Sequence, residues 1–380
     1  MTIALFINNF TNIEKDKDPG VIAESLVKLG QEITLYCLKT DVTDWAGVKI
    51  KTITLAELNS PDFWAQEAAP VLIIYSWLSL RYSRLIKILE QLNKKIILKL
   101  DSDGHLIYPL APSYLRVFGI TSSLQDRLIH LARLIQWTFL PKIISRKKIK
   151  QITKAAALII ESPLAQKNLQ QSLIYWRRED LAEKIVFIPN PVTTGNKDSS
   201  GDKPRENLII SIGRWSDRRK NGAGIVKVLS TLSVPNWKFL LIGAGSKKLK
   251  EKINKKNPTL KINSLEAVPR VEIPDYLKRG KIFFAPSLAD SFNLAAAEAL
   301  SCGLSLAVTP LESFIYFTAN GHCGTAAKNF KVKNIGSALK TEMAKWENNY
   351  YRPEESAANW QKELNPEKVG RQISELIASL

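Results

Sequence analysis

The most informative segment of the chain is IFFAPSLADSFNLAAAEALSCG, residues 282–303. Its apolar start predicts a buried strand, and its Ala- and Leu-rich part predicts a helix that begins near Ser291 and stops at Gly303. Two acids mark this helix, Asp290 just before it and Glu298 about two turns inside it. If the span were helical throughout, the two acids would lie ~12 Å apart along the axis.

The acid pair has a functional and a structural interpretation. The separation matches the length between a sugar and a ribose across a diphosphate, and the backbone N–H groups of residues 291–294 would receive phosphate oxygens between the acids. In the structural alternative, Asp290 only caps the helix and Glu298 is a solvated helix residue. For an isolated acid pair the structural alternative is the stronger one.

The same strand-then-helix pattern recurs along the chain, and its strands are near-continuous apolar runs, which is typical of a parallel sheet covered on both faces. The expected strands are 3–7, 33–37, 71–75, 96–100, 157–160, 185–188, 208–212, 239–242, 282–285 and 304–308. The expected helices include 20–30, 223–232, 291–301 and 335–346. Between Thr193 and Asn207 the composition changes to Thr, Gly, Asn, Lys, Asp and Ser, which indicates a linker. We therefore predict an α/β protein with two doubly wound domains, 1–192 and 207–365.

Length and composition exclude several classes of protein. The 380 residues are too many for one ordinary domain, and 45% hydrophobic with 24% charged residues is normal for a globular chain. Three cysteines, Cys37, Cys302 and Cys323, are too few for a disulfide framework or a zinc site. We expect no membrane span and no signal peptide, hence a cytoplasmic setting. The net charge of +18 favours an anionic partner: nucleic acid, an anionic membrane or a phosphorylated substrate.

A second motif, IGRWSDRRKNG at residues 212–222, follows the first expected strand of the second domain. Its glycines let the backbone approach a ligand, and two of its cations would clamp a diphosphate. Standing alone, this motif would be interpreted as a solvated basic loop. Together with the acid pair, it resembles the Gly-Arg…Lys loop and the acid-x7-acid helix of the GT-B glycosyltransferases of the large group 1 family, known as family 4.

The resemblance is strong over residues 185–310 and vague before residue 150. Weaker similarities are the segments 161–162, 188–192 and 242–245. The final stretch 366–380 is similar to the family's helix that crosses back onto the first domain. The resemblance implies a GT-B fold, two Rossmann-like domains with a cleft between them, in which the first domain carries the acceptor and the second the nucleotide-sugar donor.

The resemblance also implies the roles of residues. Asp290 is the catalytic acid on the sugar side, Glu298 holds the ribose hydroxyls, and Arg214 and Lys220 neutralise the diphosphate so that it leaves without a metal. Positioning and charge stabilisation would supply most of the catalysis, with retention of configuration. The other expected donor-binding residues are Gly213, Arg270, Val271, Ser291, Phe292, Asn293 and Leu294.

Two departures from the family motif concern the sugar contact. The usual first acid is Glu, followed by Gly-Phe-Gly, whereas this chain has Asp290, followed by Ser291, Phe292 and Asn293. Asp is one methylene shorter than Glu. Asn tolerates a left-handed backbone better than most residues, so the turn would survive. These departures motivate an alternative function, a non-catalytic protein that binds a sugar nucleotide or a polysaccharide on a GT-B scaffold.

In the first domain, the stretch DSDGH at residues 101–105 follows an expected strand. By the resemblance, Asp101 is a catalytic residue facing the reacting sugar, with Asp103 and His105 on the acceptor side. Two alternatives remain: a D-x-D triplet that binds Mg²⁺ or Mn²⁺, and a turn closed by Asp side chains. Asn9 and Gly20 fall where the family has its acceptor-side glycine loop.

The remaining motifs in the sequence give weaker evidence of function. The stretch 243–248 lacks the third glycine of a dinucleotide fingerprint, so we do not expect a nicotinamide enzyme. His130 and His322 have no recognisable partners and are treated as structural. Residues 128–154 are apolar and basic, and either rest on anionic lipid or form a solvated helix face. No nucleic-acid-binding motif accompanies the charge.

The sequence thus predicts an enzyme that transfers a hexosyl group, with glucose the first choice, from a UDP-sugar to a saccharide or lipid-linked saccharide. The product would be an envelope or extracellular polysaccharide. We expect no metal and no cofactor besides the nucleotide-sugar donor, no nucleic acid partner, and a peripheral place at the inner face of the plasma membrane.

Overall fold

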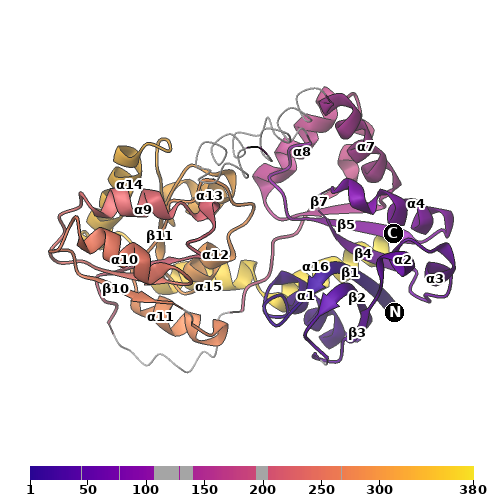
Figure 1. Cartoon of the computed structure of the whole chain (residues 1–380), viewed down its shortest axis with the longest axis horizontal. Helices are drawn as coiled ribbons and strands as arrows, with labels where there is room; N and C mark the ends of the chain where they lie inside the picture. The colour runs from indigo at the N-terminus through magenta and orange to yellow at the C-terminus, as the bar shows by residue number, and fades with distance from the viewer. Residues whose placement is uncertain (44, 77, 107–127, 129–139, 194–203, 267) are drawn as a thin grey trace. The chain divides into compact units, whose positions relative to one another are not determined.

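The computed structural model describes residues 1–43, 45–76, 78–106, 128, 140–193, 204–266 and 268–380 (Figure 1). The described residues form two compact units. Unit 1 comprises residues up to 192 together with 364–380, and unit 2 comprises residues 193 and 204–363. The chain therefore passes from one unit to the other close to the expected linker, and its last 17 residues, Leu364–Leu380, return to unit 1.

Unit 1 is built on a seven-stranded sheet whose strand order is β3-β2-β1-β4-β5-β6-β7. All of its neighbouring strands are parallel; Ile3, for example, pairs with Ile33 on one side and with Val71 on the other. The strands are β1 (Thr2–Phe10), β2 (Glu32–Thr40), β3 (Lys49–Thr52), β4 (Val71–Ser76), β5 (Lys95–Leu100), β6 (Ala157–Ile160) and β7 (Ile185–Phe187).

Helices cover both faces of this sheet. Along β1, Ala4 and Phe6 belong to one buried core, whereas Ile3 and Leu5 belong to the other. Because successive side chains of a strand point to opposite faces, this alternation places a core on each side of the sheet. The helices are α1 (Asp18–Lys28), α2 (Leu55–Leu58), α3 (Pro61–Ala65), α4 (Ser83–Gln91), α7 (Pro141–Lys154), α8 (Pro163–Tyr175) and α16 (Pro366–Ser379).

The C-terminal helix α16 packs on α1, so the two ends of the chain share one core (Figure 1). Gly370 makes this approach possible, because a Cβ atom at that position would lie 2.9 Å from the Cβ of Ser25 on α1. Val369, Ile373 and Ile377 of α16 are buried in the core that also holds Ile22.

Unit 2 has a six-stranded parallel sheet in the order β10-β9-β8-β11-β12-β13. The strands are β8 (Leu208–Ile212), β9 (Lys238–Ile242), β10 (Ile262–Leu265), β11 (Ile282–Ala285), β12 (Ser305–Val308) and β13 (Gly324–Ala326). The helices are α9 (Gly222–Leu229), α10 (Ser246–Asn254), α11 (Ile273–Arg279), α12 (Leu294–Ser301), α13 (Glu312–Thr318), α14 (Val332–Glu347) and α15 (Pro353–Glu363).

The predicted α/β class with two parallel sheets is confirmed. Sequence analysis missed β3, β10 and β13, which lie at the edges of the two sheets and have more polar sequences than the central strands. The expected helix start near Ser291 is wrong, because α12 begins at Leu294. Among the described helices, none is both long and apolar enough to cross a bilayer.

Candidate functional site

The turn between β11 and α12 carries the acid that sequence analysis placed beside the sugar. Asn293 ends this turn with φ 65° and caps α12, and its side-chain oxygen accepts the N–H of Ala296 at 3.0 Å. The left-handed backbone of Asn293 breaks the expected continuous helix. Asp290 therefore lies outside the helix, and the ~12 Å spacing derived for a continuous helix does not apply.

The backbone N–H groups that α12 offers to an anion are not the ones expected from the sequence. Residues 291–293 precede the helix, and the N–H of Ala296 is already bound by Asn293. The N–H groups of Leu294 and Ala295 belong to the first turn, where an α-helix offers no partner of its own. These two groups, rather than those of residues 291–294, are the helix donors suited to a phosphate oxygen.

Asp290 is joined to two other predicted site residues. Its Oδ2 lies 2.7 Å from the ammonium of Lys220 and accepts the amide N–H of Asn293 at 2.7 Å. The Lys220 and Asp290 side chains are 24% and 15% exposed, so this ion pair is partly desolvated but reachable by a ligand. The structure thus brings the phosphate-clamp lysine, the sugar-side acid and the turn residue together.

The basic loop after β8 is anchored to the end of β11. The side chain of Asn221, which caps α9 with φ 56°, donates to the carbonyl of Pro286 at 2.9 Å, and the N–H of Leu288 donates to the carbonyl of Arg219 at 2.7 Å. Arg214 is exposed, and within the described part of the chain no acid pairs with its guanidinium. It is available for an anion.

Glycines at the ends of β8 and β9 bring these two segments together. Gly243 has φ 111°, and a Cβ atom there would lie 2.2 Å from the carbonyl oxygen of Gly213. No other residue would fit this position without moving the backbone. Gly213, an expected donor-binding residue, is therefore fixed next to the second glycine segment.

Glu298, the expected ribose ligand, is buried on α12 and paired with Arg270. Burial raises the pKa of the Glu298 carboxyl above its ordinary value, and the nearby guanidinium of Arg270 opposes this rise. The structural alternative of a solvated helix acid is thus wrong. Two residues that sequence analysis placed around the nucleoside, Arg270 and Glu298, are in contact.

The remaining donor-side candidates differ in accessibility. Val271 is 78% exposed, whereas the ring of Phe292 is buried and packs edge-on against Phe317 at a centroid distance of 5.0 Å. Phe292 therefore belongs to the core and offers a ligand only its backbone. Ser291 and Leu294 are partly exposed.

In unit 1, Asp101 and Asp103 have different surroundings. Asp101 is exposed directly after β5. Asp103 accepts the N–H of His105 at 3.3 Å, and its backbone carbonyl accepts the amide of Asn168 at 2.9 Å, so it closes a turn. Within the described residues, no cluster of three or more His, Cys, Asp or Glu side chains is arranged to hold a metal.

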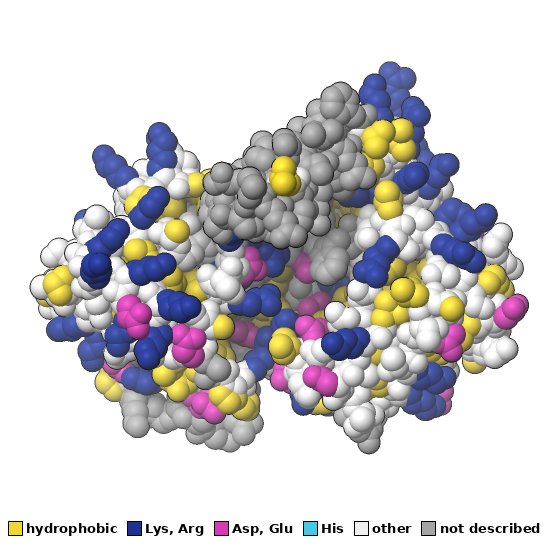
Figure 2. Space-filling view, in the orientation of Figure 1, with side chains coloured by type: hydrophobic (Ala, Val, Ile, Leu, Met, Phe, Trp, Pro, Cys, Tyr) yellow, Lys and Arg dark blue, Asp and Glu magenta, His cyan; other side chains and the backbone are white. Residues whose placement is uncertain are grey.

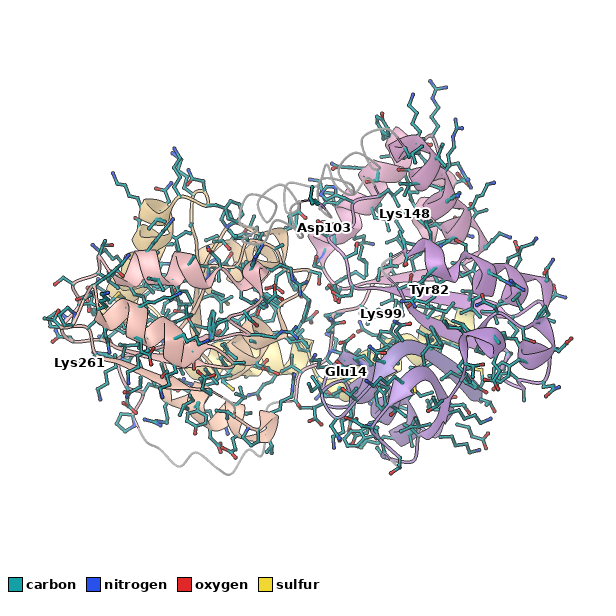
Figure 3. All side chains as sticks on the ribbon, viewed as in Figure 1. Glu14, Tyr82, Lys99, Asp103, Lys148 and Lys261 are labelled. Atoms are coloured by element: carbon teal, nitrogen blue, oxygen red, sulfur yellow. The ribbon has the colours of Figure 1, made fainter. Side chains whose placement is uncertain are left out.

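Asp103 also acts on a buried lysine of α7, Lys148 (Figure 3). Burial lowers the pKa of Lys148 to about 8, and Asp103 opposes this change. Lys148 is therefore not part of the solvent-facing basic surface to which sequence analysis assigned it. The exposed cations of α7 are Lys142, Arg146, Lys147 and Lys150, and Figure 2 shows basic side chains projecting over this helix.

The remaining predicted site residues, Gly20 and Asn9, and the two histidines give weaker evidence of a functional site. Gly20 is required by packing, because a Cβ atom there would lie 1.9 Å from the carbonyl oxygen of Lys15. Asn9 is exposed at the end of β1. His322 is exposed, and His130 lies outside the described residues.

Sequence analysis missed one group of polar side chains, at the carboxyl ends of the strands of unit 1. Lys99 and Glu161 are 1% and 0% exposed and lie 4.0 Å apart. Asn190 bridges them: it accepts from Lys99 at 2.5 Å and donates to Glu161 at 2.6 Å. The available signal was a lysine inside an otherwise apolar strand, KIILKL.

Comparison with known proteins shows which family unit 2 matches. The family model described as "Glycosyl transferases group 1" matches residues 193–363, which include all of the donor-side residues above. Residues 193–363 therefore form a domain of the group 1 glycosyltransferase family.

Two curated relatives agree with this family. The chain is 32% identical over 127 residues to a subunit of phosphatidylinositol N-acetylglucosaminyltransferase from Arabidopsis thaliana, which covers 32% of the chain and 28% of the relative. It is 26% identical over 172 residues to phosphatidyl-myo-inositol mannosyltransferase of Mycolicibacterium smegmatis, which covers 43% of the chain and 44% of the relative. The matches thus span less than half of either relative.

The fold of the whole chain is GT-B. Over 100% of both chains it is similar to the solved structure of Anabaena HepE in complex with UDP, with a TM-score of 0.71 and 12% identity. The predicted fold class is therefore confirmed, and the family model confirms the predicted family for residues 193–363.

Proposed function

We propose that this protein is an enzyme that transfers a hexosyl group from a UDP-sugar to a saccharide acceptor. The observation that carries the proposal is the contact of Lys220, Asp290 and Asn293 at the start of α12, inside a group 1 domain. This arrangement holds an ammonium, a carboxylate and the first-turn N–H groups of one helix in one place. A diphosphate needs the cation and the N–H groups, and a sugar hydroxyl needs the carboxylate.

In the proposed complex, Lys220 and the exposed Arg214 neutralise the diphosphate, and the N–H groups of Leu294 and Ala295 bind its oxygens. Glu298 accepts the ribose hydroxyls, and the guanidinium of Arg270 opposes the rise that burial causes in the pKa of that carboxyl. The cations stabilise the negative charge that develops as the nucleoside diphosphate leaves, so that no metal or other cofactor takes part. Retention of configuration is part of the proposal.

The donor is proposed to be UDP-glucose. Anabaena HepE, which has the same fold, has been solved in complex with UDP-glucose. The two curated relatives are named for N-acetylglucosamine and mannose instead. The proposal therefore has two levels: a nucleoside diphosphate sugar as the class of donor, and glucose as the specific sugar.

Nucleotide release from a panel of UDP-, GDP- and ADP-sugars tests the proposal. UDP-glucose should give the fastest release, and EDTA should leave the rate unchanged. Release from a GDP- or ADP-sugar alone would overturn the UDP assignment. Complete inhibition by EDTA would overturn the metal-independent mechanism and favour the D-x-D alternative at Asp101 and Asp103.

The acceptor is proposed to be lipid-linked and to be met at an anionic membrane surface. The first turns of α7 expose Lys142, Arg146 and Ile143, and Leu140 just before the helix is also exposed. Exposed cations beside exposed aliphatic side chains suit an interfacial helix. Cosedimentation with vesicles containing anionic lipid should fall when Arg146 and Lys147 are replaced by Gln. Equal binding to neutral vesicles would contradict this role.

A non-catalytic sugar-nucleotide-binding protein is the second candidate. It is favoured by the engagement of Asp290 with both Lys220 and Asn293, which leaves this carboxylate fewer free positions for a sugar hydroxyl. Calorimetry with UDP-glucose, followed by product analysis, separates the two functions. Tight binding without UDP release would support the binding protein.

A further inference from the structure

The carboxyl ends of three neighbouring strands in unit 1 carry a set of ionisable side chains. Tyr75 lies near the end of β4, Lys99 lies near the end of β5 (Figure 3), and Asp101 and Glu161 directly follow β5 and β6. In open parallel sheets, ligands bind beyond this edge. Of these four side chains, Lys99 and Glu161 are buried, and Asp101 is exposed.

One carboxylate oxygen of Glu161 has interaction partners within the described residues. Its Oε2 accepts the amide of Asn190 at 2.6 Å and lies 4.0 Å from the ammonium of Lys99. The ammonium itself donates to the other end of the same amide at 2.5 Å. Asn190 therefore stands between the buried cation and the buried acid, and Lys99 neutralises Glu161 only in part.

The other oxygen of Glu161 is different. Its Oε1 is buried and accepts no hydrogen bond from any described residue. Asp101 and Glu161 directly follow Leu100 and Ile160, which pair in the neighbouring parallel strands β5 and β6, and the two acidic side chains interact with each other. Two carboxylates so close together cannot both be ionised without a large cost, and the one that is buried is the one that keeps a proton. Burial raises the pKa of Glu161 well above its ordinary value, Asp101 adds to this rise, and Lys99 opposes it.

We propose that Glu161 is a positioning residue that stays protonated and donates its O–H to the carboxylate of Asp101, so that this exposed carboxylate is held in place to accept a hydrogen bond from the acceptor hydroxyl. This inference rests on the proposed transferase function. It assigns Glu161, Asn190 and Lys99 to the support of Asp101, and it makes acceptor use depend on the protonation of a residue that the acceptor does not touch.

The groups that face Glu161 determine how the site responds to pH. They are Asp18 at the start of α1, Lys99 of β5 and Asp101, and Tyr75 of β4 in turn faces Asp18. Burial raises the pKa of Asp18 to about 6, Asp101 adds to this rise, and Lys99 and Lys17 oppose it. The group sets three carboxyls against one ammonium. When pH rises far enough to ionise Glu161, its hydrogen bond to Asp101 is replaced by repulsion, and acceptor use should fall.

Steady-state kinetics across pH test the proposal with two substitutions of similar size. Glu161→Gln keeps a donor, the amide N–H, and should retain most of the acceptor kcat/KM at pH 7 while losing the alkaline fall of the wild type. Glu161→Met has no donor and should lower the acceptor kcat/KM by about 100-fold, because a misplaced group costs roughly that factor. The affinity for UDP should be the same in both variants, which also shows that they fold.

A matched control is Glu375→Gln, which removes an exposed glutamate of α16 in the same unit and should keep the wild-type pH profile. The proposal is overturned if Glu161→Gln has the alkaline limb of the wild type, or if Glu161→Met uses the acceptor as well as the wild type does.

A second measurement tests the protonation of Glu161 without any need for transfer activity. If no transfer activity is found, that result counts against the proposed transferase function and not against the protonation of Glu161. The folded protein holds a proton on Glu161 that the unfolded chain releases above its ordinary pKa of about 4.5. The folding equilibrium constant of the wild type should therefore fall relative to that of Glu161→Gln as pH rises above 5. Equal pH dependence of the two proteins would overturn the proposal.

Discussion

At the carboxyl ends of its strands, unit 2 pairs each of its two key acids with a cation, whereas unit 1 sets three carboxyl groups against one ammonium. In unit 2, Lys220 meets Asp290 and Arg270 meets Glu298, and Arg214 is an additional exposed cation. In unit 1, Glu161 faces Asp18 and Asp101 as well as Lys99. This contrast supports the proposal that unit 2 binds the anionic nucleotide-sugar donor and unit 1 the hydroxylated acceptor.

The largest effect that would sharpen this contrast concerns Lys220. Replacing it with Ala removes the cation that meets both Asp290 and the proposed diphosphate, and should cost about 2–5 kcal/mol in donor binding or catalysis. That loss corresponds to a fall of about 30-fold to several thousand-fold in nucleotide release. The control is Lys227→Ala, which removes an exposed lysine of α9. Full activity of Lys220→Ala would contradict the proposed role of unit 2 in binding the diphosphate.

The second effect concerns the buried acid of unit 2. Arg270→Ala leaves the carboxylate of Glu298 without its cation, and should lower the free energy of unfolding by about 3 kcal/mol. Adding Glu298→Gln to this variant removes the uncompensated charge and should restore at least half of the loss. Denaturant unfolding measures both. A double variant no more stable than Arg270→Ala would show that the pair is not coupled.

A smaller effect tests the excess of acid in unit 1. The pKa of Asp18 is raised from 3.8 to about 6 in the folded protein, so the folded chain binds its proton more tightly than the unfolded chain does. Stability should therefore fall as pH rises from about 4 to about 6. Asp18→Asn should be more stable than the wild type by about 2–3 kcal/mol at pH 7 and nearly equal to it near pH 4. Thermal unfolding at the two pH values provides the test; a destabilised variant at pH 7 would contradict it.

The smallest effect concerns the turn of unit 2. Asn293→Gly keeps the left-handed backbone and should change the free energy of unfolding by only a few tenths of a kcal/mol. Asn293→Ala loses the cap and strains the backbone, and should cost about 1–2 kcal/mol. Equal stability of these two variants would show that the left-handed turn does not matter.

Much of the fold could be predicted because the central strands are long apolar runs. The edge strands β3, β10 and β13 could not, because an edge strand is partly exposed and need not be apolar. The start of α12 was misplaced because the Ala-rich pattern says nothing of the backbone at Asn293, although its tolerance of a left-handed turn was recognised.

The candidate site of unit 2 could be predicted because its residues lie in two short motifs with fixed spacing. The group in unit 1 could not, because Lys99, Glu161 and Asn190 are far apart in the sequence and are brought together by the order β5-β6-β7. A lone lysine in an apolar strand indicates a buried partner but does not identify it.

A crystal structure of the protein with UDP tests the proposed donor site most strictly. We expect the diphosphate to contact Lys220 and the N–H groups of Leu294 and Ala295, and the ribose hydroxyls to bind Glu298. Density for the nucleotide at any other place, with Lys220 and Glu298 untouched, would contradict it.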